Sequence, residues 1–110
     1  MTDRELDALV AEKVFLYRLE KVANGYATGI ILGPSGTSMS VPNYSTDIAT
    51  AFRVLEELPG LKGIGYGPAR KDWTAYFQIN IDHPTHRASD KSAPRAICLA
   101  ALLAVGVDAL

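Results

Sequence analysis

The residues best suited to chemistry are few, and their spacing argues against catalysis. Asp82, His83 and His86 lie within five residues, and histidines three apart can bind a metal from one helix face. Pro84 separates the two histidines and disfavours a helix there, so a solvated loop is the favoured interpretation and a metal site the alternative. Cys98 lies in an apolar stretch, where a free thiol is typically a small buried hydrophobe. With two histidines and no motif of paired carboxylates, the sequence predicts a protein that is not an enzyme.

A run of closely spaced glycines raises the question of a phosphate-binding loop. Gly60, Gly63, Gly65 and Gly67 follow one another at short intervals. Their spacing matches neither of the two glycine motifs that cradle phosphates, G-x-x-x-x-G-K-[ST] and G-x-G-x-x-G. We therefore expect a turn followed by an edge strand, with a phosphate cradle as the alternative.

The segment Trp73–Ile81 alternates cleanly between apolar and polar residues, which predicts a strand with one buried face. On the polar face, Tyr76 offers an aromatic plane, and Gln78 and Asn80 offer hydrogen-bond donors and acceptors. A nucleobase needs both for stacking and for recognition of its edges. Ordinary exposure to solvent explains the same face equally well. The side chains expected on the buried face are Trp73, Ala75, Phe77, Ile79 and Ile81.

Two expected helix N-termini could hold an anion, since each offers free amides and the positive end of a helix dipole. Ser45 and Ser92 are good N-cap residues for these helices. Arg95 falls in the first turn of the second one, where a cation is unfavourable to the helix. A bound anion would explain that arginine, and a salt bridge to Asp90 would explain it equally.

The elements that must position these residues can be outlined from capping and periodicity. Thr2 and Glu5 form a capping box for a helix from Asp3 to Val14. Strands follow, with turns expected at residues 24–25 and 33–36. A second helix should begin at Ser45 and bury Ile48, Ala51, Phe52, Leu55 and Leu58. A last helix, apolar almost all round, should run from Ser92 to Gly106 between other layers.

Composition sets the class of the molecule. The chain has 110 residues, 48% of them hydrophobic and 21% charged, which suits one globular domain over residues 1–110. No apolar run is long enough to span a membrane, the polar start gives no signal-peptide pattern, and a single cysteine fits a reducing cytoplasm. The predicted fold class is α/β in the broad sense (α+β), a mostly antiparallel sheet covered by helices.

The net charge of −1 conceals an uneven distribution. Residues 1–61 carry five basic and eight acidic side chains, whereas residues 62–95 carry six basic and three acidic ones. A nucleic-acid polymer is therefore not an expected partner of the whole chain. A compact anionic metabolite is compatible with the basic region, although a solvated surface would look the same.

Four segments in order give the chain a family resemblance. Met1–Val14, Pro42–Ile48, Trp73–Phe77 and Ala93–Leu102 resemble the corresponding parts of small phage proteins of the α-β-α (ABA) sandwich family. That family includes sponges that act against the Thoeris defence system of bacteria. The segment Phe15–Tyr17 departs from the short Gly-Trp segment that usually follows the first helix.

The resemblance implies a non-enzymatic phage protein that sequesters cyclic ADP-ribose isomers, or cyclic oligonucleotides, without cleaving them and without a cofactor or metal. It also implies a homo-oligomer in the cytoplasm of the infected host. Because 110 residues leave little room for a deep pocket within one chain, we expect the site at a subunit interface. The alternative is a phage protein–protein inhibitor or accessory protein with no small-molecule pocket. The site residues expected from local chemistry are Tyr44 or Tyr66 to stack on the base, Gln78 and Asn80 to read polar edges, Arg87 and Arg95 to neutralise phosphates, and Ser45 to supply amides.

Overall fold

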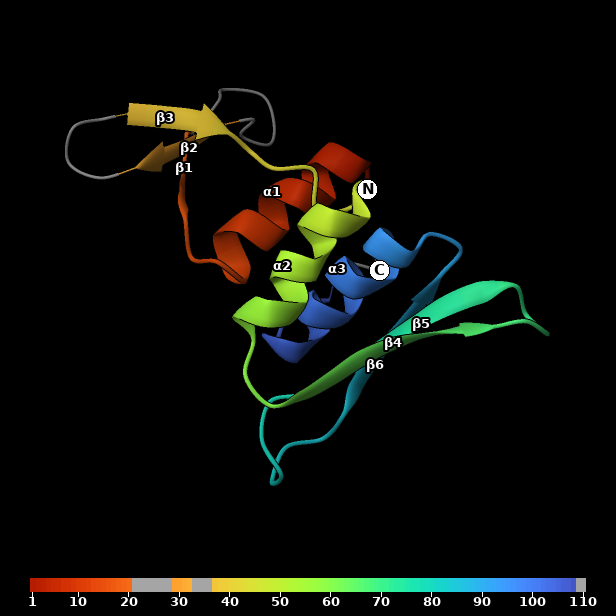
Figure 1. The fold of residues 1–110 in the computed structure, drawn as a ribbon. Coiled ribbons are helices and arrows are strands. Elements are labelled where there is room, and N and C mark those ends of the chain that lie inside the picture. The colour runs from red at the N-terminus through yellow and green to blue at the C-terminus, as the bar shows by residue number, and fades with distance from the viewer. Residues whose placement is uncertain (21–28, 33–36, 109–110) are drawn as a thin grey trace.

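The computed structural model describes residues 1–20, 29–32 and 37–108 of the chain (Figure 1). Three helices and two three-stranded antiparallel sheets make up this part of the molecule. The α+β sandwich class expected from the sequence is confirmed. The strands divide between two sheets, however, whereas the sequence suggested one. Within the described residues, no helix is both long and apolar enough to cross a membrane.

The first and last helices form where their capping residues predict. Helix α1 spans Asp3–Lys13, and the Thr2 hydroxyl oxygen accepts a hydrogen bond of 3.1 Å from the Glu5 amide. Helix α3 spans Ala93–Ala104 with Ser92 as its N-cap. Gly106 follows it with a φ of +88°, a left-handed conformation that glycine adopts readily and that ends helices.

The second sheet contains the strands β4 (Leu61–Gly67), β5 (Asp72–Gln78) and β6 (His86–Asp90), in the order β4-β5-β6. The expected edge strand at residues 61–67 is therefore confirmed. The predicted strand Trp73–Ile81 ends three residues early, so that Ile81, expected on the buried face, is 90% exposed. Strand β6 was not predicted, because its sequence HRASD has a single apolar residue and no β-branched one.

The first sheet is smaller and contains β1 (Arg18–Leu19), β2 (Gly29–Leu32) and β3 (Thr37–Ser40), in that order. Ile30 of β2 is fully buried, while all four residues of β3 are exposed. The turns expected at residues 24–25 and 33–36 lie outside the described residues.

Helix α3 is the centre of the core. It lies between the β4-β5-β6 sheet and the helices α1 and α2, with α2 spanning Ile48–Glu57 (Figure 1). Seven consecutive residues of α3, from Ala96 to Leu102, are buried. Phe77 of β5 is also fully buried, on the face that covers α3. An apolar surface on all sides of a helix requires this position between layers, so the prediction for α3 is confirmed.

Helix α2 differs from its prediction at both its start and its buried face. It begins at Ile48 with Asp47 as the N-cap, and not at Ser45. Residues 44–46 form a turn instead. Ala51 and Leu58 are buried and Leu55 packs against the core, as predicted, whereas Ile48 and Phe52 are 42% and 45% exposed. Val54, which was not predicted, is buried as well, so periodicity identified only part of the face that packs on the core.

Candidate functional site

The seven residues expected to bind a ligand do not form one site. They occupy four separate places: the interior beside α1, the turn after β5, the outer face of the second sheet, and the end of that sheet near the start of α3.

Tyr44 and Ser45 lie in the interior, each 2% exposed. The Tyr44 ring stacks on Phe15 with 5.0 Å between ring centroids, and burial, followed by the charge of the Tyr17 side chain, raises the pKa of its phenol. The Ser45 amide donates a 2.8 Å hydrogen bond to the Asp7 carboxylate, and its hydroxyl donates to the Asp3 carbonyl at 3.1 Å. The prediction of a free helix N-terminus at Ser45 is therefore wrong, since a carboxylate of the chain itself occupies the anion position. Neither residue offers a surface to a ligand in this structure.

Asp7 is the polar residue of the interior that the sequence analysis missed. It is fully buried on α1 and forms a 3.0 Å ion pair with Arg4. Arg4 also donates to the Asn43 side chain at 2.7 Å and to the Val41 carbonyl at 2.9 Å. These contacts fasten the segment before α2 to α1. One signal was available in the sequence, because Asp7 follows Leu6 inside the apolar stripe of the helix.

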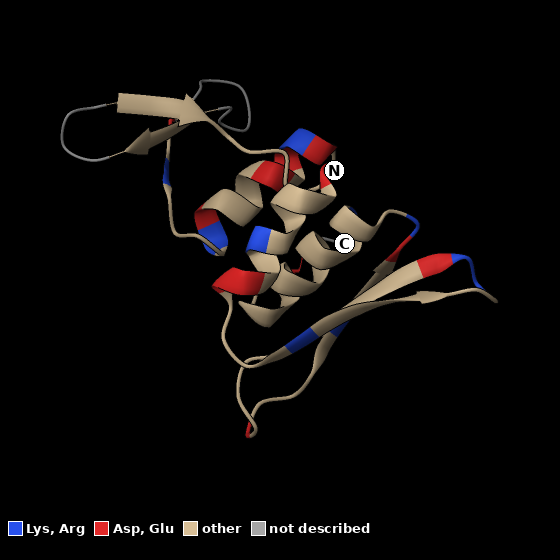
Figure 2. Ribbon diagram, viewed as in Figure 1, with Lys and Arg blue, Asp and Glu red and all other residues tan. Residues whose placement is uncertain are grey.

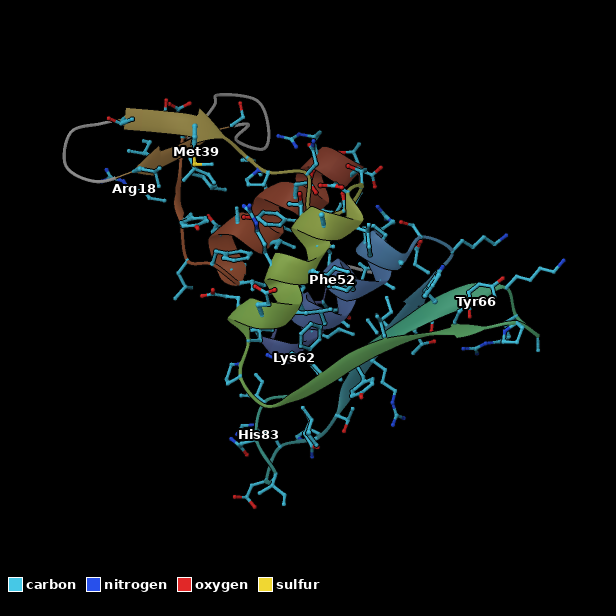
Figure 3. The ribbon with its side chains drawn as sticks, viewed as in Figure 1. Arg18, Met39, Phe52, Lys62, Tyr66 and His83 are labelled. Atoms are coloured by element: carbon cyan, nitrogen blue, oxygen red, sulfur yellow. The ribbon has the colours of Figure 1, made fainter. Side chains whose placement is uncertain are left out.

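Gln78 and Asn80 use their amide groups within the turn that follows β5. Gln78 Nε2 donates to the His83 carbonyl at 3.0 Å, and Asn80 Oδ1 accepts from the Asp82 amide at 2.9 Å. Asn80 lies beyond the end of the strand and does not continue its polar face. His83 is exposed in this turn, as the loop interpretation required (Figure 3), whereas His86 is half-buried as the first residue of β6 and not in a loop.

Arg87 lies on the outer face of the second sheet, opposite Tyr76 on the neighbouring strand. Within the described part of the chain it forms no ion pair. The Tyr76 ring lies over Gly63, where a Cβ atom would meet ring atoms at 2.7 Å. Glycine therefore lets this aromatic ring approach the backbone of β4 closely, while Tyr76 remains 39% exposed.

Tyr66 and Arg95 are the two ends of a row of residues across the second sheet. Tyr66 pairs with Trp73, and Trp73 pairs with Asp90. Directly opposed residues share a face, and this face also carries Phe77, so the row points to the side of α3. The Tyr66 and Trp73 rings are 5.1 Å apart and tilted by 57°. Tyr66 is 49% exposed, at the far end of β4 from Lys62 (Figure 3).

Arg95 extends this row onto α3. Its guanidinium lies 3.3 Å from Asp90 and 2.7 Å from Asp3. The salt bridge to Asp90 that the sequence offered as one explanation of Arg95 is therefore present. Asp3 supplies a second carboxylate, from the first turn of α1. Because Arg95 is 27% exposed and Asp3 is 49% exposed, solvent and solutes can reach this pair.

The charge split seen in the sequence follows the architecture. The basic region, residues 62–95, makes up the second sheet and the start of α3, whereas α1 and α2 carry half of the 12 acidic residues (Figure 2). Tyr66 and Arg95 lie on the basic part.

Other chemistry finds no support among the described residues. No group of three His, Cys, Asp or Glu side chains there is arranged to hold a metal ion. Cys98 is fully buried in α3, and burial raises the pKa of its thiol. A low thiolate population and a lack of access make it a core residue and not a nucleophile.

Comparison with known proteins places this arrangement in a family. A model of the phage ABA sandwich domain family matches residues 8–102. The chain belongs to this family. The phage ABA sandwich domain thus includes nearly all of the described structure, from the middle of α1 to the last turns of α3.

A solved structure shares the fold of this phage ABA sandwich domain. It is a phage protein from Bacillus cereus ATCC 14579, known from a 2.0 Å crystal structure. The TM-score is 0.82 with 22% sequence identity, and the match covers 100% of this chain and 93% of the other. At this identity the likeness concerns the fold alone. No curated protein matches the chain.

Proposed function

We propose that this phage protein binds a small, anionic, nucleotide-derived signal and sequesters it without chemical change. The observation that carries the proposal is the row Tyr66–Trp73–Asp90–Arg95 at the exposed end of the second sheet. It puts the exposed ring of Tyr66, packed on the half-buried Trp73, in one row with a guanidinium at the start of a helix, and a nucleotide needs a stacking surface and a cation for its phosphates.

The proposed site works by exchange of anions. Arg95 is held by the carboxylates of Asp3 and Asp90 in the free protein. A phosphate that takes the place of the more exposed carboxylate, Asp3, would keep the guanidinium paired while the base lies on Tyr66. Sequestration requires affinity and a sufficient amount of protein, and it requires no general acid or base.

Among such signals, we propose the cyclic ADP-ribose isomers as the ligand class, with action in the cytoplasm of the infected cell. Support comes from membership in the phage ABA sandwich domain family, which the sequence resemblance identifies as the family that includes anti-Thoeris sponges, and from the chemistry of the row. Cyclic ADP-ribose offers a base for Tyr66 and a pyrophosphate for Arg95. We extend the proposal to a homo-oligomer in which a second copy completes the shallow site.

A protein–protein inhibitor is the second candidate, and one observation favours it. Ile48 and Phe52 lie one turn apart on α2 and are both exposed. An exposed apolar pair at this spacing is typical of a helix that docks on a partner. A protein–protein inhibitor that docks through α2 would not need the Tyr66–Arg95 row.

One experiment separates these functions. The purified protein is incubated with a cyclic ADP-ribose isomer, freed of unbound ligand by gel filtration, and heated to release what it holds. Mass spectrometry of the released material should return the intact isomer. A cleaved product would indicate an enzyme. The absence of heat of binding to any cyclic nucleotide in calorimetry would leave the protein–protein inhibitor as the better function.

A further inference from the structure

The two carboxylates that hold Arg95 are not equivalent. Both oxygens of Asp90 have partners, since Oδ1 accepts a 2.9 Å hydrogen bond from the Ser92 amide and Oδ2 lies 3.3 Å from Arg95 Nε. Asp3 contacts Arg95 through Oδ1 at 2.7 Å, and its side chain is 49% exposed against 27% for Asp90. Asp90 is therefore the fixed partner of the guanidinium, and Asp3 is the partner that an anion from solution can replace.

Replacement of Asp3 needs a movement of its side chain only. The backbone around this residue is held on both sides, because the Asp3 carbonyl accepts a 3.1 Å hydrogen bond from the Ser45 hydroxyl and the Glu5 amide donates to the Thr2 hydroxyl oxygen. The first turn of α1 thus stays in place when the carboxylate rotates into solvent. In the free protein this carboxylate occupies Arg95 Nη1, so a phosphate that binds there has to displace it.

An anion with a single charge gains little from this exchange. It replaces one exposed, charge-assisted hydrogen bond to Arg95 by another of the same kind, and the displaced Asp3 carboxylate stays nearby and repels it. A ligand therefore needs a second favourable contact before the exchange clearly favours binding. The cations around Arg95 determine whether such a contact exists.

Lys91 is positioned to make that second contact. It stands between Asp90 and Ser92, and both neighbours contact Arg95: Asp90 through its carboxylate, and Ser92 by accepting a 3.4 Å hydrogen bond from the Arg95 amide. The Lys91 side chain is exposed, and within the described part of the chain it forms no ion pair. Its ammonium group is therefore free to bind a second negative charge of a ligand that already contacts Arg95.

Two further cations, Arg70 and Lys71, lie at this end of the sheet, in the turn between β4 and β5 (Figure 2). Arg70 Nε lies 3.7 Å from the Asp72 carboxylate. Lys71 is exposed and has no ion pair among the described residues, but neither of its neighbours in the chain contacts Arg95 there. Lys71 thus matches Lys91 in charge and exposure and differs from it in position.

We propose that Asp3 is a built-in competitor for the anion site, and that Lys91 enables an anion with a second negative charge to displace it. The inference rests on the proposed function and adds a rule of selection to it. A cyclic nucleotide with two phosphates is held, because one phosphate replaces Asp3 on Arg95 and the other binds Lys91. A cyclic nucleotide with one phosphate binds weakly, because it meets the competitor and cannot offset it, which is a common basis of specificity.

Calorimetric titration with two adenine nucleotides tests both residues: a cyclic ADP-ribose isomer, which has two phosphates, and cyclic AMP, which has one. Asp3→Asn should bind each of them about two- to fivefold more tightly than the wild type, because the amide competes less for the guanidinium. Glu5→Gln is the matched control, since it removes an acidic charge from the same turn of α1 and Glu5 has no ion pair in the described structure. Damage to the fold does not strengthen binding, so a gain in Asp3→Asn alone supports the competitor.

The same titrations test Lys91. Lys91→Gln should weaken binding of the cyclic ADP-ribose isomer about three- to tenfold and leave that of cyclic AMP unchanged, whereas Lys71→Gln, the matched control, should keep the preference for two phosphates. Equal losses in the two lysine variants, or equal losses of both nucleotides in Lys91→Gln, would contradict the role of Lys91. A wild type that binds the isomer as tightly as Asp3→Asn does would overturn the inference alone. Binding of neither nucleotide by either of these two proteins would overturn the proposed function as well.

Discussion

Arg95 shows how one side chain can be satisfied in the free protein and still be available to a ligand. Its two carboxylate partners come from different elements, Asp3 from α1 and Asp90 from β6. Both partners are partly exposed, and exposed ion pairs contribute little to stability. Exchange of one carboxylate for a phosphate therefore costs little, so Arg95 is the residue at which the proposed function is most directly tested.

We expect Arg95→Glu to weaken binding of a cyclic ADP-ribose isomer by about 1–3 kcal/mol, or roughly 5- to 150-fold. The variant replaces a phosphate partner by a carboxylate, and isothermal titration calorimetry measures the change. Arg87→Glu is the matched control, since it makes the same charge change on the opposite face of the sheet. Equal affinities for wild type and a folded Arg95→Glu variant, or equal losses for both variants, would remove Arg95 from the site.

At the scale of elements, the turn between α2 and β4 depends on glycine for two separate reasons. Gly60 has a left-handed φ of +90°, and the space where its Cβ would lie is filled by the carbonyls of Gln78 and Ile79. Gly65, within the following strand β4, has neither constraint, because its φ is not positive and nothing lies within 4 Å of its Cβ position. A comparison of the two glycines therefore distinguishes a position that requires glycine, Gly60, from one where glycine could be replaced without a clash, Gly65.

Gly60→Ala should lower the free energy of unfolding by more than about 2 kcal/mol, since strain at positive φ adds to a clash with backbone that cannot move aside. Gly65→Ala, the matched control, should change it by about 0.5 kcal/mol or less. Urea unfolding of both variants measures the difference. Similar midpoints would mean that the chain accommodates a side chain at Gly60, and that the close approach to β5 is not required.

The elements that the sequence predicted well are those specified by local signals. Thr2 and Ser92 accept hydrogen bonds from the first turns of their helices, and the alternation at Trp73, Ala75 and Phe77 correctly predicts the buried face of β5. Capping and periodicity act over a few residues, so they can be read without the fold. The start of α2 could not be predicted in this way, because the long-range hydrogen bond from the Ser45 amide to Asp7 helps to determine where the helix begins.

The site was less predictable, for a physical reason. Residue types indicate which side chains could bind a base or a phosphate, but tertiary contacts decide which of them are free. Tyr44 is covered by Phe15, and Asn80 bonds to its own turn. Tyr66 and Arg95 are joined by strand register and by Asp90, over a sequence separation that no local pattern reveals.

At the scale of the whole molecule, α3 makes the two halves of the fold depend on each other. It is covered by the second sheet on one side and by α1 and α2 on the other (Figure 1). Cys98 lies in the middle of this helix and is fully buried. Its thiol therefore reaches water only when the layers around α3 separate, which makes its ionisation a measure of global unfolding.

Stability should consequently fall at alkaline pH through Cys98. Burial raises the pKa of this thiol in the folded chain, whereas an unfolded cysteine titrates near about 8.5. The folded state therefore keeps its proton while the unfolded state loses it, so the contribution is complete below about pH 8.5 and declines above it. Between pH 7 and pH 10 the loss of unfolding free energy should reach about 2 kcal/mol.

Urea unfolding at both pH values should show this loss in the wild type and a smaller one in Cys98→Ala, because alanine has no proton to lose. An equal pH dependence in the two proteins would mean that the thiol ionises without separation of the layers around α3.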